Sequence, residues 1–184
     1  MLTAVLHAAL AALALGVLST FGDFLWAYLR VPHRIVTGLG HGAIICLAIG
    51  AIIGLRAGRP LAGLMVGPLV GVLAAGAFYL LAPMLRWNAM FPAWMLFWIC
   101  FALLQWRLSA DRGLTSALLR GVVAAVLSGI AFYLVSGMWT NPPRGGPNYA
   151  VFLLNWTFAF FPGFLALFWR PAGELPTPNS RSPT

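Results

Sequence analysis

The sequence contains no lysine and only three acidic residues, Asp23, Asp111 and Glu174, against eleven arginines. Charged residues make up 8% of the chain, whereas soluble domains carry roughly 25%. These residues are too few to form a water-facing shell around a buried core. The hydrophobic residues, which are 61% of the chain, must therefore meet lipid. The composition excludes an ordinary soluble domain and predicts an integral membrane protein.

The net charge of +8 does not indicate nucleic-acid binding. The arginines stand singly in short connections between apolar runs. Arginines in such places set the topology of membrane proteins and face lipid headgroups. We expect the partners to be membrane lipids or other hydrophobic small molecules, and no nucleic acid.

The sequence also lacks the usual motifs of metal sites and of nucleophilic catalysis, such as CxxC, HExxH and GxSxG. Cys46 and Cys100 each lie in the middle of an apolar run, which is typical of small core residues. His33 and His41 are eight residues apart, which is ~12 Å along a helix and too far for one ion. We therefore predict no metal and no cofactor, and favour a protein that is not an enzyme.

Six segments are long and apolar enough to approach the ~20 residues that a membrane-spanning helix needs. They cover residues 2–29, 35–55, 61–82, 90–106, 114–138 and 149–169, the fourth being short. Prolines and glycines separate them. The predicted fold is an all-α polytopic membrane helical bundle of about six transmembrane helices over residues 1–169. Residues 170–184, rich in Pro, Ser and Thr, predict a disordered cytoplasmic tail.

The arginines favour one face of the membrane. The face that holds both termini would carry seven of them: Arg56, Arg59, Arg107, Arg112, Arg120, Arg170 and Arg181. The opposite face would carry four: Arg30, Arg34, Arg86 and Arg144. Since cytoplasmic loops are enriched in basic residues, both termini are predicted to be cytoplasmic. The all-arginine basic set with abundant Ala and Gly favours a GC-rich bacterial source, hence a bacterial inner membrane.

The first apolar segment has two interpretations. It lacks a basic region at its start and runs well past the usual length of a signal-peptide core, which favours a retained helix. The alternative is a cleaved signal peptide, which would leave five spans and an amino terminus outside.

Gly63, Gly67 and Gly71 are spaced four apart and share one face of the third predicted helix. A second helix can approach such a face closely. Packing within the bundle is the favoured interpretation. The alternatives are a groove that lines a ligand, or a contact with a second copy or another membrane protein.

Polar residues inside the spans form the candidate ligand-binding site. Asp23 is the only acid well inside a span, where a carboxylate is costly and needs a partner. Thr37 and His41 are four residues apart, on one polar stripe of the second span. Tyr133 and Asn155 fall at a similar depth, as does Tyr79. The simpler alternative is that these residues hydrogen-bond to one another between helices, and that the tyrosines belong to the interfacial aromatic belt.

A basic, proline-containing link (residues 29–34) leads into a small-residue-rich second helix. A Trp and an Asp-Arg connection (residues 106–112) end the fourth helix, and the loop before the sixth opens with Trp139-Thr140-Asn141. This order of features resembles the INSIG family of six-helix endoplasmic-reticulum membrane proteins and their bacterial relatives. The resemblance implies a compact bundle whose central cavity binds a lipid, such as a sterol or a glycerolipid. It also implies action by binding, with Asp111 contacting a partner.

Three functions remain open. The leading hypothesis is a non-enzymatic integral membrane protein that binds an apolar or amphiphilic, lipid-like ligand within the bundle. The first alternative is a small proton-coupled transporter or channel that uses Asp23 and His41. The second is a membrane-embedded lipid-modifying enzyme with His41 as base.

Overall fold

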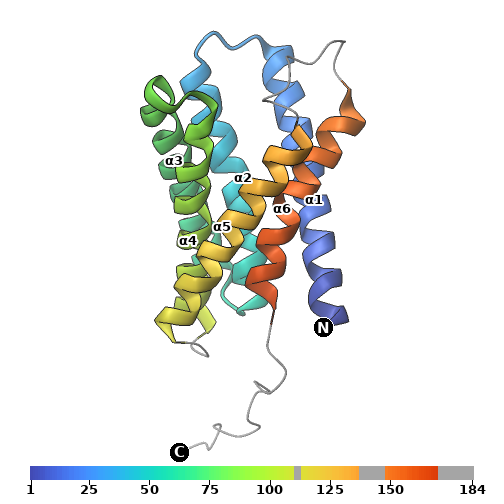
Figure 1. Cartoon of the computed structure of the whole chain (residues 1–184), viewed down its shortest axis with the longest axis vertical. Coiled ribbons are helices and arrows are strands. Elements are labelled where there is room, and N and C mark those ends of the chain that lie inside the picture. Colours follow the sequence, from blue (N-terminus) through green and yellow to red (C-terminus); the bar gives the residue numbers. More distant parts are fainter. Residues whose placement is uncertain (110–112, 137–147, 170–184) are drawn as a thin grey trace, which may run out of the picture.

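The computed structural model describes residues 1–109, 113–136 and 148–169. Within these residues the chain forms six α-helices and one short 3₁₀ helix, without strands. They are α1 (Leu2–Leu29), α2 (Arg34–Arg56), α3 (Pro60–Leu85), η1 (Arg86–Ala89), α4 (Met90–Ser109), α5 (Leu114–Ser136) and α6 (Tyr149–Phe168). Figure 1 shows the helices lying side by side with their long axes roughly aligned. The predicted all-α fold is confirmed for this part of the chain.

Five helical segments of the described chain are long and apolar enough to cross a membrane. By length and composition the chain is thus an integral membrane protein. One of the five, Pro60–Ser109, is a segment of 50 residues that includes α3, η1 and α4. A straight helix of that length would measure ~75 Å, but the chain reverses direction at η1, so α3 and α4 lie beside each other (Figure 1).

The observed helices differ little from the predicted ranges. The largest differences are that α3 reaches Leu85 instead of residue 82, and that α4 reaches Ser109 instead of residue 106. Helix α3 continues through Pro83 in its last turn, as it does through Pro68 in its interior. The longer α4 brings the short fourth segment to 20 residues. The predicted tail at 170–184, together with Asp111 and the loop after helix α5, lies outside the described residues.

The bundle has two ends, which we name by what lies there. The terminal end holds the start of α1 and the last residues of α6, and the η1 end holds η1 and the link from α1 to α2 (Figure 1). At the terminal end, Arg56 Nη1 lies 3.1 Å from His7 Nδ1, and its guanidinium lies 4.1 Å from the centre of the Phe168 ring. Arg120 donates to the Trp169 carbonyl at this end. These contacts tie α1, α2, α5 and α6 together there.

Gly63, Gly67 and Gly71 lie where α3 packs against α2. A Cβ atom at Gly63 would overlap the carbonyl of Gly50, and one at Gly67 would overlap the carbonyl of Cys46. A Cβ at Gly71 would likewise overlap a carbonyl of α2. All three glycines are buried. The glycine face is therefore covered by α2 within the same chain, with the two backbones in direct contact.

An aromatic core joins α4 to α6. Trp98 is fully buried, with its ring 5.6 Å from that of Phe164 in an edge-on arrangement. A Cβ at Gly163 would overlap the Trp98 indole, so glycine is required there. The same cluster of buried residues also includes side chains of α1, α2 and α3, so this core lies inside the bundle.

We predict that Gly67→Ala destabilises the protein, because its methyl group overlaps the Cys46 carbonyl and must push α2 and α3 apart. Overpacking of this kind typically costs about 1–3 kcal/mol. The thermal unfolding midpoint of the protein in mild detergent measures the effect. Gly76→Ala is the matched control on the same helix, since a Cβ at Gly76 meets nothing within 4 Å. Equal midpoints for the two variants would contradict the tight α2–α3 contact.

Candidate ligand-binding cavity

A cavity of about 520 Å³ lies in the half of the bundle toward the η1 end. Residues from α1, α2, α3, η1, α4 and α6 line it. Pockets for small molecules usually measure ~300–1,000 Å³. The cavity is therefore large enough for a lipid-like molecule or part of one.

One face of α2 forms a wall of the cavity whose polarity changes along the helix. Arg34, Thr37, His41 and Ile45 line the cavity at helical spacings of three and four residues. Arg34 is exposed at the start of the helix, whereas Ile45 is 5% exposed. At a rise of ~1.5 Å per residue this wall extends ~16 Å. It therefore passes from a charged mouth, through polar residues, to an apolar base.

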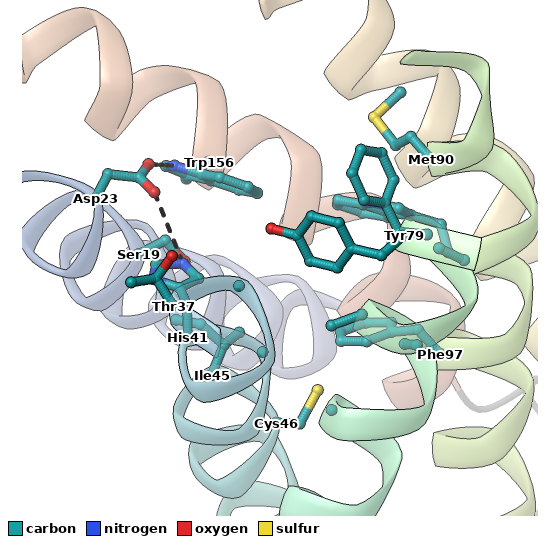
Figure 2. A pocket seen from close by; sticks show the side chains of 18 of the residues that line it. Ser19, Asp23, Thr37, His41, Ile45, Cys46, Tyr79, Met90, Phe97 and Trp156 are labelled. Carbon is teal, nitrogen blue, oxygen red and sulfur yellow. Dashed lines mark hydrogen bonds and ion pairs between the residues drawn. The ribbon is translucent and has the colours of Figure 1, made fainter. Parts of the chain in front are cut away.

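Helix α1 supplies the second polar wall. Ser19, Asp23 and Trp26 lie four and three residues apart, which places them on one helix face. The Asp23 Oδ2 atom accepts a hydrogen bond from Trp156 Nε1 of α6 at 2.8 Å. Its Oδ1 atom lies 3.9 Å from Nε2 of His41 (Figure 2). Asp23 thus contacts two other helices, as a carboxylate at membrane depth must.

His41 is held by contacts with α1. Its Nδ1 atom accepts a hydrogen bond from Trp26 Nε1 at 3.2 Å. A Cβ atom at Gly22 would lie 2.6 Å from Nδ1, so the absence of a side chain at Gly22 makes room for the ring. The Nε2 atom is buried and has no hydrogen-bond partner among the described residues. His41 therefore presents one bonded and one unbonded nitrogen.

Thr37 and Tyr79 bond to the backbone near the mouth of the cavity. The Thr37 hydroxyl and the Tyr79 hydroxyl each donate to the Arg34 carbonyl at 2.9 Å. The Tyr79 ring packs directly on Gly38, where a Cβ atom would overlap its hydroxyl. These bonds fix the first turn of α2 against α3.

The base and far wall of the cavity are apolar. Buried residues that line it there are Ile45, Cys46, Ala74, Met90, Ala93, Phe97 and Phe160. Figure 2 shows Cys46 and Phe97 on the side of the cavity away from Asp23. Cys46 is a free thiol and contributes a small apolar surface. The cavity is therefore amphiphilic, with polar side chains on α1, on the first half of α2 and, at Tyr79, on α3.

Three of the five predicted site residues, Asp23, Thr37 and His41, line the cavity. Tyr133 and Asn155 do not belong to its lining. The Tyr133 ring lies 6.0 Å from that of Phe91. The Asn155 amide faces the carbonyl oxygens of Val151 and Val135 at 3.2 and 3.0 Å, so we assign its nitrogen to that position. Asn155 thus joins α5 to α6 instead of facing the cavity.

The sequence analysis did not single out Trp26, Trp156 or Ser19. Ser19 and Trp26 share the helix face of Asp23, so the spacing was a usable signal. Trp156 comes from α6, and only the packing of α1 against α6 places it beside Asp23. His33 precedes α2 and does not line the cavity. Among the residues that the structure describes, no three His, Cys, Asp or Glu side chains group closely enough to hold a metal.

No protein-family model, no curated protein and no solved structure matches this chain. The resemblance to the INSIG family therefore stays a prediction.

We predict that Trp156→Phe destabilises the protein by about 1–3 kcal/mol, the usual cost of leaving a buried acceptor without its hydrogen bond. The change keeps an aromatic ring but removes the donor to Asp23. The free energy of unfolding in mild detergent measures the cost. In an Asp23→Leu background the same substitution should cost far less, since its acceptor is gone. An equal cost in both backgrounds would show that the loss comes from ring packing alone.

Proposed function

We propose that this chain binds an apolar or amphiphilic, lipid-like molecule in its cavity and acts by binding, without altering the molecule chemically. The observation that carries the proposal is the ordered polarity of the cavity wall along α2, from Arg34 to Ile45. An amphiphile has the same order of polar and apolar parts. Its apolar part would fill the base, and its polar part would lie near Asp23, His41 and the mouth.

The lining favours binding over catalysis. The Ser19 hydroxyl is fully buried and has no hydrogen-bond partner in the described chain, so no base activates it there. The Cys46 thiol is 1% exposed and is surrounded by apolar residues. An enzyme that works by nucleophilic catalysis would need an activated nucleophile at the substrate.

We also propose six membrane spans with both termini in the cytoplasm, in a bacterial inner membrane. Helices α3 and α4 contain 26 and 20 residues, or ~39 and ~30 Å of helix, enough for each to cross a ~30 Å hydrocarbon core. The sequence places seven arginines toward the terminal end and four toward the η1 end, which supports a cytoplasmic terminal end. The cavity would then lie in the outer half of the membrane.

The proposal predicts that a lipid copurifies with the protein and that filling the cavity displaces it. Ala74 lines the cavity and is 7% exposed, so Ala74→Phe should lower the fraction of lipid-bound protein at least severalfold. Native mass spectrometry of protein extracted in mild detergent measures that fraction. Leu73→Phe is the control, because Leu73 is 59% exposed on the outside of the same helix and does not line the cavity.

Two results would count against binding in the cavity. One is a protein that carries no lipid in repeated mild extractions. The other is an unchanged bound fraction in a folded Ala74→Phe variant. Folding of each variant is checked by its thermal unfolding midpoint.

A second candidate function, proton-coupled transport, is favoured by the 3.9 Å approach of Asp23 to His41 inside a cavity at membrane depth. Intramembrane ionisable pairs frequently belong to proton pathways. On this candidate, liposomes that contain the protein acidify when a proton gradient is imposed, and Asp23→Asn abolishes the flux. A pH-sensitive dye inside the liposomes reports it. Flux no greater than in protein-free liposomes would reject transport and leave the binding proposal standing.

A further inference from the structure

We infer that the ligand of this cavity contains a planar conjugated ring system, which lies along the aromatic side chains of α4 and α6. This inference rests on the proposed binding function and names the class of molecule that the cavity selects. It follows from the common orientation of the aromatic rings in the lining, and from the pairing of the polar groups of the lining within the protein.

Three aromatic rings of the lining have nearly the same orientation. Trp94 of α4, and Trp156 and Phe160 of α6, all line the cavity. The Phe160 ring is inclined by 22° to the ring of Trp94 and by 19° to that of Trp156, and its centroid lies 5.8 Å from each. A flat molecule parallel to the Phe160 ring is therefore within 22° of the other two.

A fourth ring holds this orientation from behind the lining. Phe132 of α5 is 9% exposed and does not line the cavity. It stacks on Trp156 at 5.1 Å and 28°, and on Trp94 at 5.8 Å and 24°. Helices α4, α5 and α6 thus fix the two indoles before any ligand binds, which reduces the entropy lost on binding.

The two indoles keep surface that a ligand can cover. Trp94 and Trp156 are half-buried, whereas Trp98 and Phe101 of the same aromatic core are fully buried. Phe160, which packs against both indoles, is 3% exposed. Since Trp94 and Trp156 line the cavity, a molecule inside it can stack on them, and aromatic rings prefer such stacking on other π systems.

The polar side chains of the lining are bonded within the protein. Asp23 and His41 each accept a hydrogen bond from an indole N–H, and the hydroxyls of Thr37 and Tyr79 donate to a backbone carbonyl. The second ring nitrogen of His41 is buried. Hydrogen bonds at these groups therefore distinguish poorly between one ligand and another, and the aromatic surface becomes the main source of selectivity.

The part of the lining that α2 and α3 contribute also suits a flat molecule. It includes the small residues Gly42, Gly71, Ala74 and Ala75. A Cβ atom at Gly71 would overlap the Gly42 carbonyl, so the backbones of the two helices touch here. Few side-chain atoms project from this surface into the cavity, and it offers a planar ring an even area of contact.

A planar ring gains more from this lining than a saturated molecule of the same size. The atoms of a conjugated ring can all approach an indole face together, and aromatic pairs are stabilised beyond the area that they bury. The hydrogens of a puckered ring system hold many of its carbons away from a flat face, so its dispersion contacts are weaker. The lining therefore favours conjugated rings over saturated rings and over alkyl chains.

A competition between three hydrocarbons of equal carbon number tests the inference. They are 2-hexylanthracene, its fully hydrogenated analogue and icosane, which are respectively flat, puckered and without rings. The full-length protein, delipidated in mild detergent, is mixed with equal amounts of each, and native mass spectrometry measures the adducts. The anthracene adduct should exceed each of the others about fivefold or more, because only the flat probe gains stacking contacts.

Substitutions then assign the preference to the aromatic wall. Trp94→Leu should bring the anthracene adduct close to that of the hydrogenated analogue, whereas Trp94→Phe, which keeps a ring, should retain most of the preference. Trp169→Leu is the matched control, because it removes an indole that does not line the cavity. The thermal unfolding midpoint shows that each variant is folded, and the competition on the unmodified protein decides the question without any variant.

The outcomes separate this inference from the proposed function. Equal adducts of the three probes, all lost in Ala74→Phe, would overturn the ring preference and retain binding in the cavity. A preference for either saturated probe would also overturn it, as would an anthracene preference that persists in folded Trp94→Leu. The absence of all three adducts from a protein that carries lipid before delipidation would overturn this inference alone. If no lipid copurifies either, the proposed function is overturned with it.

Discussion

Hydrocarbon offers no hydrogen bonds, so each polar side chain within a membrane span must find its partner inside the protein or in a bound molecule. Asp23 shows how this constraint shapes the bundle. One carboxylate oxygen accepts from Trp156 of α6, and the other faces His41 of α2, which in turn accepts from Trp26 of α1. These contacts connect α1, α2 and α6 at one depth of the bundle, because the same polar groups would find no hydrogen-bond partner in lipid.

The cavity arises from how the helices pair. Helix α2 packs chiefly on α3 through the backbone contact at Gly63, Gly67 and Gly71, whereas α1 packs chiefly on α6. The contact between α1 and α2 is much smaller. Two tightly packed pairs therefore meet along a loosely packed boundary, and the cavity lies at that boundary toward the η1 end. Gly71 itself lines the cavity together with Gly42 of α2, so the close glycine contact between α2 and α3 borders the cavity directly.

Much of the fold could be predicted from the sequence. The limits of each helix follow from the length of its apolar run and the positions of prolines, and both are local features of the sequence. The helices begin and end close to their predicted limits, and α3 differs mainly because Pro83 is accommodated in its last turn. The burial of Gly67 also agrees with the simplest interpretation of a four-residue glycine spacing, which is packing within the bundle. In the sequence, the reversal of the chain at η1 was visible only as a gap between the third and fourth predicted helices.

The candidate site could be predicted only in part. Asp23, Thr37 and His41 were identified by their depth and their spacing, which are local properties. Depth alone could not say which way Tyr133 and Asn155 face, since that depends on the rotation of α5 and α6 within the bundle. The same limit hid Trp156, whose bond to Asp23 joins residues 133 positions apart. The INSIG resemblance agrees in layout with an all-helical bundle, and its functional implications stay predictions.

The central claim is that the cavity beside Asp23 and His41 holds an amphiphile. An experimental structure of the protein in a lipid nanodisc tests it most directly. The account predicts elongated density that begins within hydrogen-bonding distance of Asp23 and His41 and continues along Ile45 to Phe97. A cavity that holds only isolated water, or that is closed by the side chains lining it, would contradict the account.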